Sequence, residues 1–172
     1  MTLKQARQIS YIKDFLKQYP IGKTVIKWAI ILSLAGLVWF ANRQAQRYLG
    51  EQARIETGLS STLLAQAFVL AQRDHKLVLA EMSAVWCPTC RKLDQTIFSN
   101  EKVKAKIKAD YIFSRIDYDS AQAKTFMENY QVRGFPTVLV LNAHGEQLAR
   151  LPLTFNSQEF IAMLAKVSGT VH

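Results

Sequence analysis

Cysteine is scarce in this chain: only two of the 172 residues are cysteines, at positions 87 and 90. One pair cannot build the multi-bridge framework of small secreted domains. Seven glycines and four prolines are too few for a collagen-like or low-complexity chain. Hydrophobic residues make up 49% of the sequence and charged residues 20%, which excludes a disordered chain and suffices for one ordinary domain with an appendage.

Acidic residues are also few, with 13 Asp and Glu against 22 Lys and Arg. Over half of the resulting net charge of +9 lies in residues 1–27, which carry six Lys or Arg and one acid. Residues 1–20 are predicted to be a basic cytoplasmic segment with apolar residues at helical spacing. No groove-reading motif accompanies the charge, so we expect no nucleic-acid partner.

An apolar run follows this basic segment. Residues 28–41 carry no charge, and the longer stretch 21–41 reaches the roughly 20 residues that a helix needs to cross a bilayer. Lys23 and Lys27 can extend to the lipid headgroups, and a tryptophan lies near each end of the run. We therefore predict a single transmembrane anchor over 21–41.

The excess of Lys and Arg before the anchor sets its orientation. The positive-inside rule puts the N-terminus in the cytoplasm and residues 42–172 outside it. We therefore expect a single-pass protein of the bacterial inner membrane, with its C-terminal part in the oxidising periplasm. A cleaved signal peptide and a buried core helix are the alternatives for the apolar run.

Strand and helix patterns alternate in the C-terminal part, 60–172. Residues 42–59 are interpreted as a linker or a helical stalk, and Ser60 or Ser61 is expected to cap a helix that runs to about Arg73. The patterns predict an α/β fold in which helices flank a central mixed sheet. Strands are expected at 77–82, 111–116, 137–141 and 146–151, and helices at 87–97, 101–108, 122–130 and 156–167.

The two cysteines form a Cys-Pro-Thr-Cys motif after the first predicted strand. Because a helix is predicted to begin at Cys87, its sulfur would lie where unpaired N–H groups and the helix dipole favour negative charge. Pro88 suits the first helical position, and Cys90 follows on the same face within disulfide range. We predict thiol–disulfide exchange, with Cys87 as the exposed attacking thiolate and Cys90 as the resolving thiol that closes the redox disulfide.

A second motif, Gly-Phe-Pro-Thr at 134–137, leads into an apolar strand pattern. A cis bond before Pro136 would leave the Phe135 backbone free to pair with an extended substrate, with the proline ring against the disulfide. A trans proline at a strand entry is the alternative. Trp86 would shield the sulfurs, although core packing would also explain it and Phe135. The substrate-binding candidates are Trp86, Pro88, Thr89, Phe135 and Pro136.

Together the two motifs resemble those of the thioredoxin superfamily, in which the second motif carries a cis-proline that faces the dithiol. The resemblance covers about 77–164 and is strongest to the C-terminal periplasmic domains of thiol:disulfide interchange proteins DsbD. It implies a thioredoxin-like fold and a dithiol that passes electrons between thiol partners. The shared residues are Trp-Cys-x-x-Cys at 86–90 with a basic residue after it, Thr-Ile-Phe-Ser at 96–99, Asp117 at a strand end, and Val-Arg-Gly-Phe-Pro-Thr at 132–137.

Two acids near the dithiol are candidate catalytic residues. Glu81 interrupts an apolar run that is expected to be buried, where an unpaired carboxylate is costly. Thioredoxins carry a buried acid at this position, usually Asp, and the resemblance implies that Glu81 exchanges a proton with Cys90 during mixed-disulfide breakdown. Asp94, one turn past Cys90, would tune the thiols. The alternatives are a strand-end acid reaching solvent for Glu81 and an ion pair with Arg91 for Asp94.

Two differences from the DsbD domains bear on function. One apolar segment stands in place of a multi-helix membrane domain, and the Pro-Thr dipeptide between the cysteines, which influences the reduction potential, is different. We expect a protein-disulfide reductase that acts on extracytoplasmic protein thiols and is recycled by a membrane or periplasmic redox partner. The alternatives are a disulfide oxidase or isomerase, and a non-catalytic tethered chaperone or assembly module.

Neither a cofactor nor a metal ion is expected. A structural zinc site normally has four ligands, and this chain adds to its two cysteines only His75, His144 and His172, which are dispersed. Zinc binding is therefore the least favoured of the functions considered.

Overall fold

The computed structural model describes residues 21–169; residues 1–20, with the expected basic segment, and 170–172, with His172, lie outside the described part. By its contacts the chain divides into two compact units, 1–44 and 45–172. One helix, α2 (Ile21–Thr57), contributes to both units.

In the first unit, α2 carries large apolar side chains on its surface. Trp28, Leu32, Leu37 and Trp39 are each more than half exposed. Within the described part of the chain, α2 is the one helix that is long and apolar enough to cross a membrane. This exposure argues against the alternative of a buried core helix.

The last part of α2 belongs to the second unit. Gly50, Ala53 and Thr57 recur at intervals of three and four residues and are buried, so one stripe of the helix packs against the domain. The helix ends before Gly58, whose φ of +61° is readily adopted by glycine. The expected linker or stalk, 42–59, is thus helical as far as Thr57, and its residues from Ala45 onward pack within the second compact unit.

The second unit is built on a mixed sheet of four strands, as predicted. The strands are β1 (Leu77–Ser83), β2 (Tyr111–Asp117), β3 (Thr137–Leu141) and β4 (Gln147–Leu151). Their order is β2-β1-β3-β4; β1 is parallel to β2, and β3 is antiparallel to β1 and β4. Because parallel strands end at the same sheet edge, the segments that follow β1 and β2 meet there.

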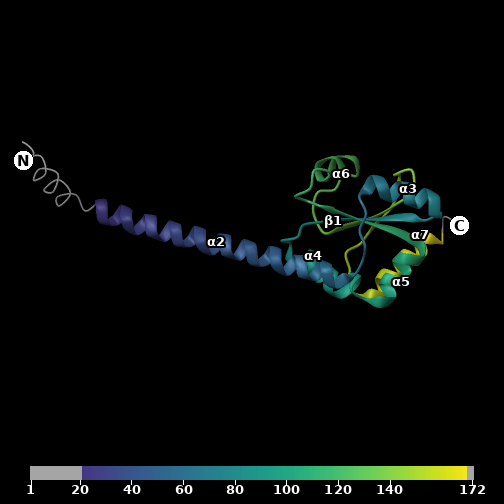
Figure 1. Cartoon of the computed structure of the whole chain (residues 1–172), viewed down its shortest axis with the longest axis horizontal. Coiled ribbons are helices and arrows are strands. Elements are labelled where there is room, and N and C mark those ends of the chain that lie inside the picture. The colour runs from purple at the N-terminus through teal and green to yellow at the C-terminus, as the bar shows by residue number, and fades with distance from the viewer. Residues whose placement is uncertain (1–20, 170–172) are drawn as a thin grey trace, which may run out of the picture. The chain divides into compact units, whose positions relative to one another are not determined.

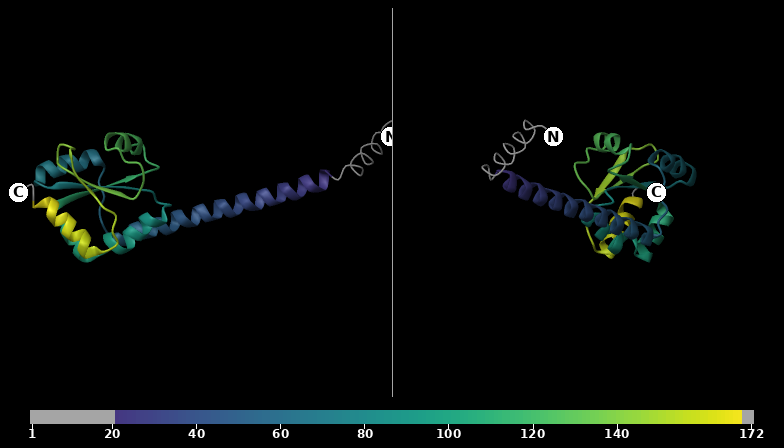
Figure 2. Two further views of the ribbon diagram at one scale, coloured as in Figure 1. Left: turned by 180° about the vertical axis from the view of Figure 1, so that it is seen from behind. Right: turned by 60° about the vertical axis from the view of Figure 1, so that its left-hand side comes forward.

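Helices cover both faces of this sheet. They are α3 (Leu64–Asp74), α4 (Pro88–Leu93), the π-helical turn η1 (Asp94–Phe98), α5 (Glu101–Asp110), α6 (Ala123–Asn129) and α7 (Ser157–Ser168). α3 and α6 lie on one face, and α5 and α7 on the other (Figure 1), as the view from behind also shows (Figure 2). This layering is the predicted α/β fold.

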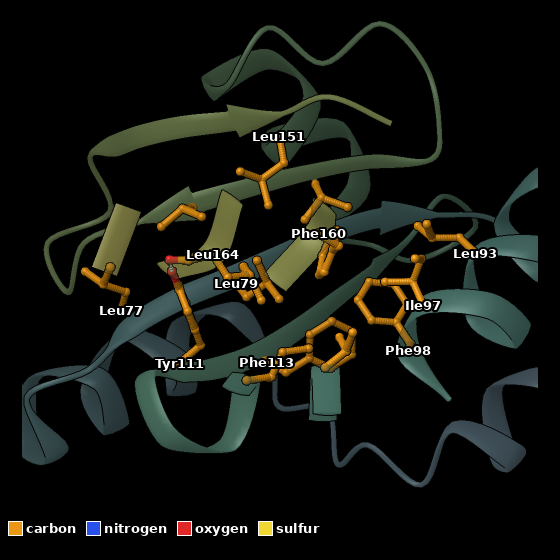
Figure 3. Packing of buried hydrophobic residues seen from close by; sticks show 14 residues of the cluster. Leu77, Leu79, Leu93, Ile97, Phe98, Tyr111, Phe113, Leu151, Phe160 and Leu164 are labelled. Carbon is orange, nitrogen blue, oxygen red and sulfur yellow. Dashed lines mark hydrogen bonds between the residues drawn. The ribbon is translucent and has the colours of Figure 1, made fainter. Parts of the chain in front are cut away.

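Strand side chains alternate between two cores, one on each face. Leu79 and Phe113 belong to the core that packs under α5 and α7 (Figure 3), whereas Ala80 belongs to the core under α3 and α6. Glu81 and Arg115 are each two residues further along their strands. The pleat therefore directs both charged side chains to the same face as Leu79 and Phe113.

The start of α3 differs from our expectation. The helix begins without a side-chain cap, so neither Ser60 nor Ser61 caps it. Ser61 Oγ instead accepts a hydrogen bond from the Arg115 backbone N–H at 2.8 Å, and the Thr62 N–H donates to the Phe113 carbonyl at 3.1 Å. Ser61 and Thr62 therefore form hydrogen bonds with the outer edge of β2. These bonds use polar groups that could otherwise cap α3.

The helix predicted over 87–97 changes its winding part-way. α4 is followed directly by the wider turn η1, in which Asp94, Ile97 and Phe98 are all buried. Single π-helical turns of this kind are frequent at functional sites. Here the turn carries an acidic side chain into the interior of the domain.

Candidate active site

The dithiol lies at the start of α4, where the sequence predicts it. Cys87 is the N-cap residue and Pro88 is the first helical residue. The Cys90 N–H donates to Cys87 Sγ at 3.3 Å, and the Arg91 N–H donates to the Cys87 carbonyl at 3.0 Å. Both cysteines are free thiols in this structure. The backbone thus gives the Cys87 sulfur a donor that can stabilise negative charge.

Both cysteines are buried, although not equally. Cys87 is 7% exposed and Cys90 is 3% exposed, so Cys87 is less accessible than we expected. Pro88 and Thr89, which lie between them, are exposed. Cys87 and Cys90 form a small buried cluster with Ala84, and Trp86 and Phe135 pack against this cluster.

Three aromatic rings form a cap beside the dithiol. Trp86 packs edge-on against Phe135 and Tyr118, with ring centroids 5.4 and 6.2 Å away, and Tyr118 lies 5.1 Å from Phe135. The Phe135–Pro136 peptide bond is cis, which confirms the expectation. The Trp86 indole N–H donates to the Asp119 carboxylate at 3.2 Å. Trp86 and Phe135 are half-buried and present apolar surface next to the reacting sulfurs, whereas Tyr118 is exposed.

A buried ion cluster joins β1, β2 and η1. Glu81 and Arg115 are direct partners in the register of the parallel strands, so their side chains emerge side by side. Arg115 Nε donates to Glu81 Oε2 at 2.5 Å, and Arg115 Nη2 donates to Asp94 Oδ1. The side chains are 0% exposed for Glu81, 4% for Asp94 and 10% for Arg115. One guanidinium therefore bridges both candidate acids.

Two ion pairs connect the end of α2 to the site. Arg47 pairs at 2.7 Å with Asp119, the carboxylate that also accepts from Trp86. Arg54 pairs at 2.6 Å with Asp117 at the end of β2. The C-terminal part of α2 is therefore held against the sheet edge at which the dithiol lies.

The end of α2 also contacts the chain on both sides of the dithiol. Gly50 packs so closely on the Val85 main chain that a Cβ atom at Gly50 would collide with the Val85 carbonyl. Gln46 accepts a hydrogen bond from Arg91 at 2.7 Å. Since Val85 precedes Trp86 and Arg91 follows Cys90, the segment that carries the dithiol is packed against α2 at both ends.

The comparison with known families agrees with this geometry. The model of the thioredoxin-like domain matches residues 64–168, which is more than half of the chain. This chain belongs to the thioredoxin-like domain family.

Relatives of this thioredoxin-like protein are named for disulfide chemistry. The thiol:disulfide interchange protein DsbD of Haemophilus ducreyi is 25% identical over 169 residues, 96% of this chain and 27% of that protein. The chain spans between 14% and 27% of the length of such curated relatives. The structure of DsbH oxidoreductase has a TM-score of 0.60 at 20% identity, covering 64% of this chain and 85% of that one. The oxidised DsbD C-terminal domain of Neisseria meningitidis has a TM-score of 0.52 at 18% identity, covering 62% and 98%. These structural likenesses show the fold.

Buried charges change the proton affinities in the thioredoxin-like domain. Burial raises the pKa of the Cys90 thiol far above its usual value; the hydrogen bond and charge of Cys87 raise it further, and the charge of Glu81 adds a smaller effect in the same direction. Burial also raises the pKa of Asp94 to about 7; Glu81 adds to this effect, whereas Arg115 and Arg54 oppose it. At neutral pH, Cys90 is therefore a thiol that needs a proton acceptor, and Asp94 is close to its titration midpoint.

The structure rules out both alternatives considered for the acids. Glu81 is fully buried and does not reach solvent. Asp94 pairs with Arg115, while Arg91 bonds to Gln46 instead. The difference arises because η1 turns Asp94 inward, away from the surface on which Arg91 lies.

The sequence patterns do not single out four residues of this site: Arg47, Arg115, Tyr118 and Asp119. The last three lie at or just after the end of β2, beside the end of parallel β1. Ligand-binding and catalytic groups gather where parallel strands end, so a position near the end of β2 could have indicated these three residues. Arg47 offers no such signal, since it lies in the polar segment 42–59, which sequence patterning assigns to a linker or stalk.

Within residues 21–169, no group of three or more His, Cys, Asp or Glu side chains is placed to hold a metal ion. His75 is the C-cap of α3, and His144 lies in the turn between β3 and β4.

Proposed function

We propose that this protein is a membrane-anchored thiol:disulfide oxidoreductase that reduces disulfides of extracytoplasmic proteins through its Cys-Pro-Thr-Cys dithiol. The observation that carries the proposal is the arrangement of Cys87 at the start of α4, the buried thiol of Cys90, and a buried carboxylate, Glu81, whose charge acts on that thiol. The names of the relatives support the same chemistry.

The proposed reaction has two displacements. The Cys87 thiolate attacks one sulfur of the substrate disulfide, which forms a mixed disulfide and releases the other substrate sulfur as a thiolate. Cys90 then gives its proton to Glu81 and attacks the Cys87 sulfur. This step breaks the mixed disulfide, closes the Cys87–Cys90 disulfide and releases the second substrate thiolate. Two electrons pass to the substrate, and a reduced partner must return them.

The aromatic cap supplies the proposed binding surface. Trp86 and Phe135 are half-buried against the cysteines, Pro136 is half-buried next to Phe135, and all three would contact apolar groups next to the substrate cystine. Pro88 and Thr89 are exposed between the cysteines and would meet the substrate first. Glu81 and Asp94 are buried and would act on protons rather than on the substrate chain.

Two features of the dithiol support the proposed direction, reduction. A strongly oxidising dithiol has a reduced form that is stabilised. Here the burial of Cys90 and the charge of Glu81 both disfavour a thiolate at that position. No histidine lies between the cysteines to offset them. At neutral pH Cys90 is therefore a protonated thiol, so the proposed reduced form gains no stabilisation from a thiolate at that position.

The proposed organisation places an anchor before the redox domain. It consists of a cytoplasmic segment 1–20, an anchor 21–41, a stalk 42–59 and a thioredoxin-like domain 60–172. The basic residues before the anchor favour a cytoplasmic N-terminus and a periplasmic domain at a bacterial inner membrane. The alignment with a DsbD over 96% of this chain supports α2 as part of the shared sequence.

The test of the chemistry uses the full chain in detergent micelles. Wild type is expected to reduce insulin disulfides with dithiothreitol as the electron source, and Cys87→Ser is expected to lose this activity. Ser60→Ala, an exposed change at the start of the thioredoxin-like domain, serves as the matched control. Insulin reduction that survives in Cys87→Ser would contradict the proposal.

The direction is tested by the reduction potential of Cys87–Cys90, measured by equilibration with glutathione or dithiothreitol. A value near about −270 mV is expected for a reductase, whereas a value near about −120 mV would overturn the direction and leave the exchange chemistry in place. Topology is tested separately in cells. A membrane-impermeant thiol reagent should label the dithiol only after the outer membrane is permeabilised.

A further inference from the structure

We propose that Arg47 of α2 is a positioning residue for the disulfide exchange: through the Asp119 carboxylate it fixes the indole of Trp86 in the aromatic cap that meets the substrate. The inference rests on the proposed function, because it concerns how this cap binds the substrate disulfide. Arg47 lies outside residues 64–168, the part of the chain that the thioredoxin-like family model matches. α2 therefore adds a group to the site from outside the matched domain.

One carboxylate oxygen links Arg47 to Trp86. Asp119 Oδ2 accepts a hydrogen bond from Arg47 Nη2 at 2.7 Å and another from the Trp86 indole N–H at 3.2 Å. A carboxylate oxygen has lone pairs for both donors, and the bond from the charged donor is the stronger one. Because the indole has a single N–H, the position of this oxygen sets the orientation of the Trp86 ring.

The Arg47 guanidinium reaches this carboxylate at a cost. The side chain is 43% exposed, yet its Nε is buried and has no hydrogen-bond partner among the described residues. A buried donor without a partner is unfavourable, and its presence in a native fold calls for a reason. Other orientations of this long side chain would return Nε to water. The bond to Asp119 supplies a reason for the orientation that is observed.

α2 also holds the rest of the segment that follows β2. Arg54 lies seven residues after Arg47, on the same helix face, and pairs with Asp117 at 2.6 Å. The Asp119 backbone N–H in turn donates to Asp117 Oδ1 at 2.9 Å. Tyr118 lies between these two acids, and its ring packs on the other two rings of the cap. Two arginines of one helix face thus fix the segment that supplies one ring of the cap and the acceptor for the indole.

The ion pair of Arg47 and the packing of α2 can be separated by substitution. Gly50 packs on the main chain of Val85, which precedes Trp86, and this contact does not involve Arg47. Arg47 and Asp119 are both partly exposed, and an ion pair of that kind contributes little to the free energy of unfolding. Replacing Arg47 should therefore free the indole while α2 stays docked through Gly50.

The experiment observes Trp86 in the reduced full chain in micelles. The chain has three tryptophans, so a Trp28→Phe/Trp39→Phe background leaves Trp86 as the single tryptophan. Quenching of its fluorescence by acrylamide measures how freely solvent reaches the indole. The variants are Arg47→Gln and Arg47→Lys. Arg43→Gln is the matched control, since it removes the same charge from an exposed position four residues earlier on the same helix.

Arg47→Gln is expected to raise the acrylamide quenching constant by about twofold, because the indole can then open locally to solvent. The KM for insulin should rise about threefold, within the roughly 1.4–5-fold that an exposed ion pair supplies. The kcat should stay within about twofold of wild type, because the lost interaction contributes to binding rather than to chemistry. Arg47→Lys should fall between wild type and Arg47→Gln, and Arg43→Gln should match wild type.

A double-mutant cycle with Asp119→Ala shows whether Arg47 acts through the shared carboxylate. Asp119→Ala alone should raise the quenching constant at least as much as Arg47→Gln does. Adding Arg47→Gln to it should change the constant by less than about a quarter, since the group that Arg47 holds is already lost. If Arg47→Gln does not fold, Arg47→Lys completes the cycle.

An unchanged quenching constant in Arg47→Gln, or an equal effect of this substitution in both backgrounds, would overturn the inference. Quenching needs no disulfide substrate. Failure of wild type to reduce insulin would therefore refute only the proposed function.

Discussion

Gly50 is the position at which a single methyl group should undock α2 from the redox domain. A Cβ atom there would collide with the Val85 carbonyl oxygen and lie 2.8 Å from the carbonyl carbon. Both atoms belong to the main chain, so neither can rotate away as a flexible side chain would. Gly50→Ala therefore forces α2 or the segment before Trp86 to move.

The size of this effect follows from two opposing contributions. Replacing glycine by alanine inside a helix normally stabilises it by about 0.5–1 kcal/mol. Overpacking a tight contact costs about 1–3 kcal/mol. Movement of α2 also weakens the Arg47–Asp119 and Arg54–Asp117 pairs, which are partly exposed and contribute at most about 1 kcal/mol each. We expect the docked state to lose about 1–2 kcal/mol in total.

Limited proteolysis of the full chain in micelles measures this loss at the peptide bond after Arg54, whose side chain is 17% exposed while α2 is docked and becomes accessible to trypsin when α2 is undocked. A loss of 1–2 kcal/mol corresponds to cleavage that is roughly 5–30-fold faster. Gly36→Ala is the matched control, since a Cβ at that helical glycine meets nothing within 4 Å. Equal cleavage of Gly50→Ala and wild type would refute the assignment of Gly50 as the docking contact.

Two further predictions concern buried polar groups. The pKa of Asp94 is raised to about 7 from an ordinary value of 3.8, so its contribution to stability is complete at acid pH and is lost as the pH rises through 7. Urea unfolding should therefore show wild type losing about 2–3 kcal/mol relative to Asp94→Asn between pH 5 and 7, and parallel pH profiles would contradict this. Tyr111→Phe removes a 2.6 Å hydrogen bond from the buried hydroxyl to the Leu164 carbonyl (Figure 3) and should lower the free energy of unfolding by about 1 kcal/mol. The exposed change Tyr48→Phe should leave the urea midpoint unchanged.

Local patterns predict most of the fold because each has a local physical cause. The apolar run of β1, the Pro88 start of α4 and the glycine-containing turn before β4 all fix their elements with neighbouring residues. The uncapped start of α3 could not be predicted in this way. Ser61 bonds to the backbone of Arg115, 54 residues away, and a bond of that range leaves no local signature.

The residues of the candidate site divide in the same way, into those that local motifs identify and those that only tertiary contacts identify. Cys87, Cys90 and Pro136 lie in motifs whose spacing carries their chemistry, and the structure brings them to one edge of the sheet. Arg115 is named by no motif: on a strand it looks like a surface charge, and only the register of β1 with β2 places it opposite Glu81. The register between two strands depends on tertiary structure, so it cannot be predicted from local patterns in a single sequence.

Arg54 connects the docking of α2 with the protons of the site. Its side chain is 17% exposed, pairs with Asp117, and donates to Ser83 Oγ at 3.2 Å at the end of β1. Its charge also opposes the effect of burial on the pKa of Asp94. If Gly50→Ala undocks α2, Arg54 moves away and Asp94 holds its proton to a higher pH. Docking of α2 and titration of Asp94 are then coupled. The Gly50 contact therefore affects the charges near the dithiol as well as the packing of α2.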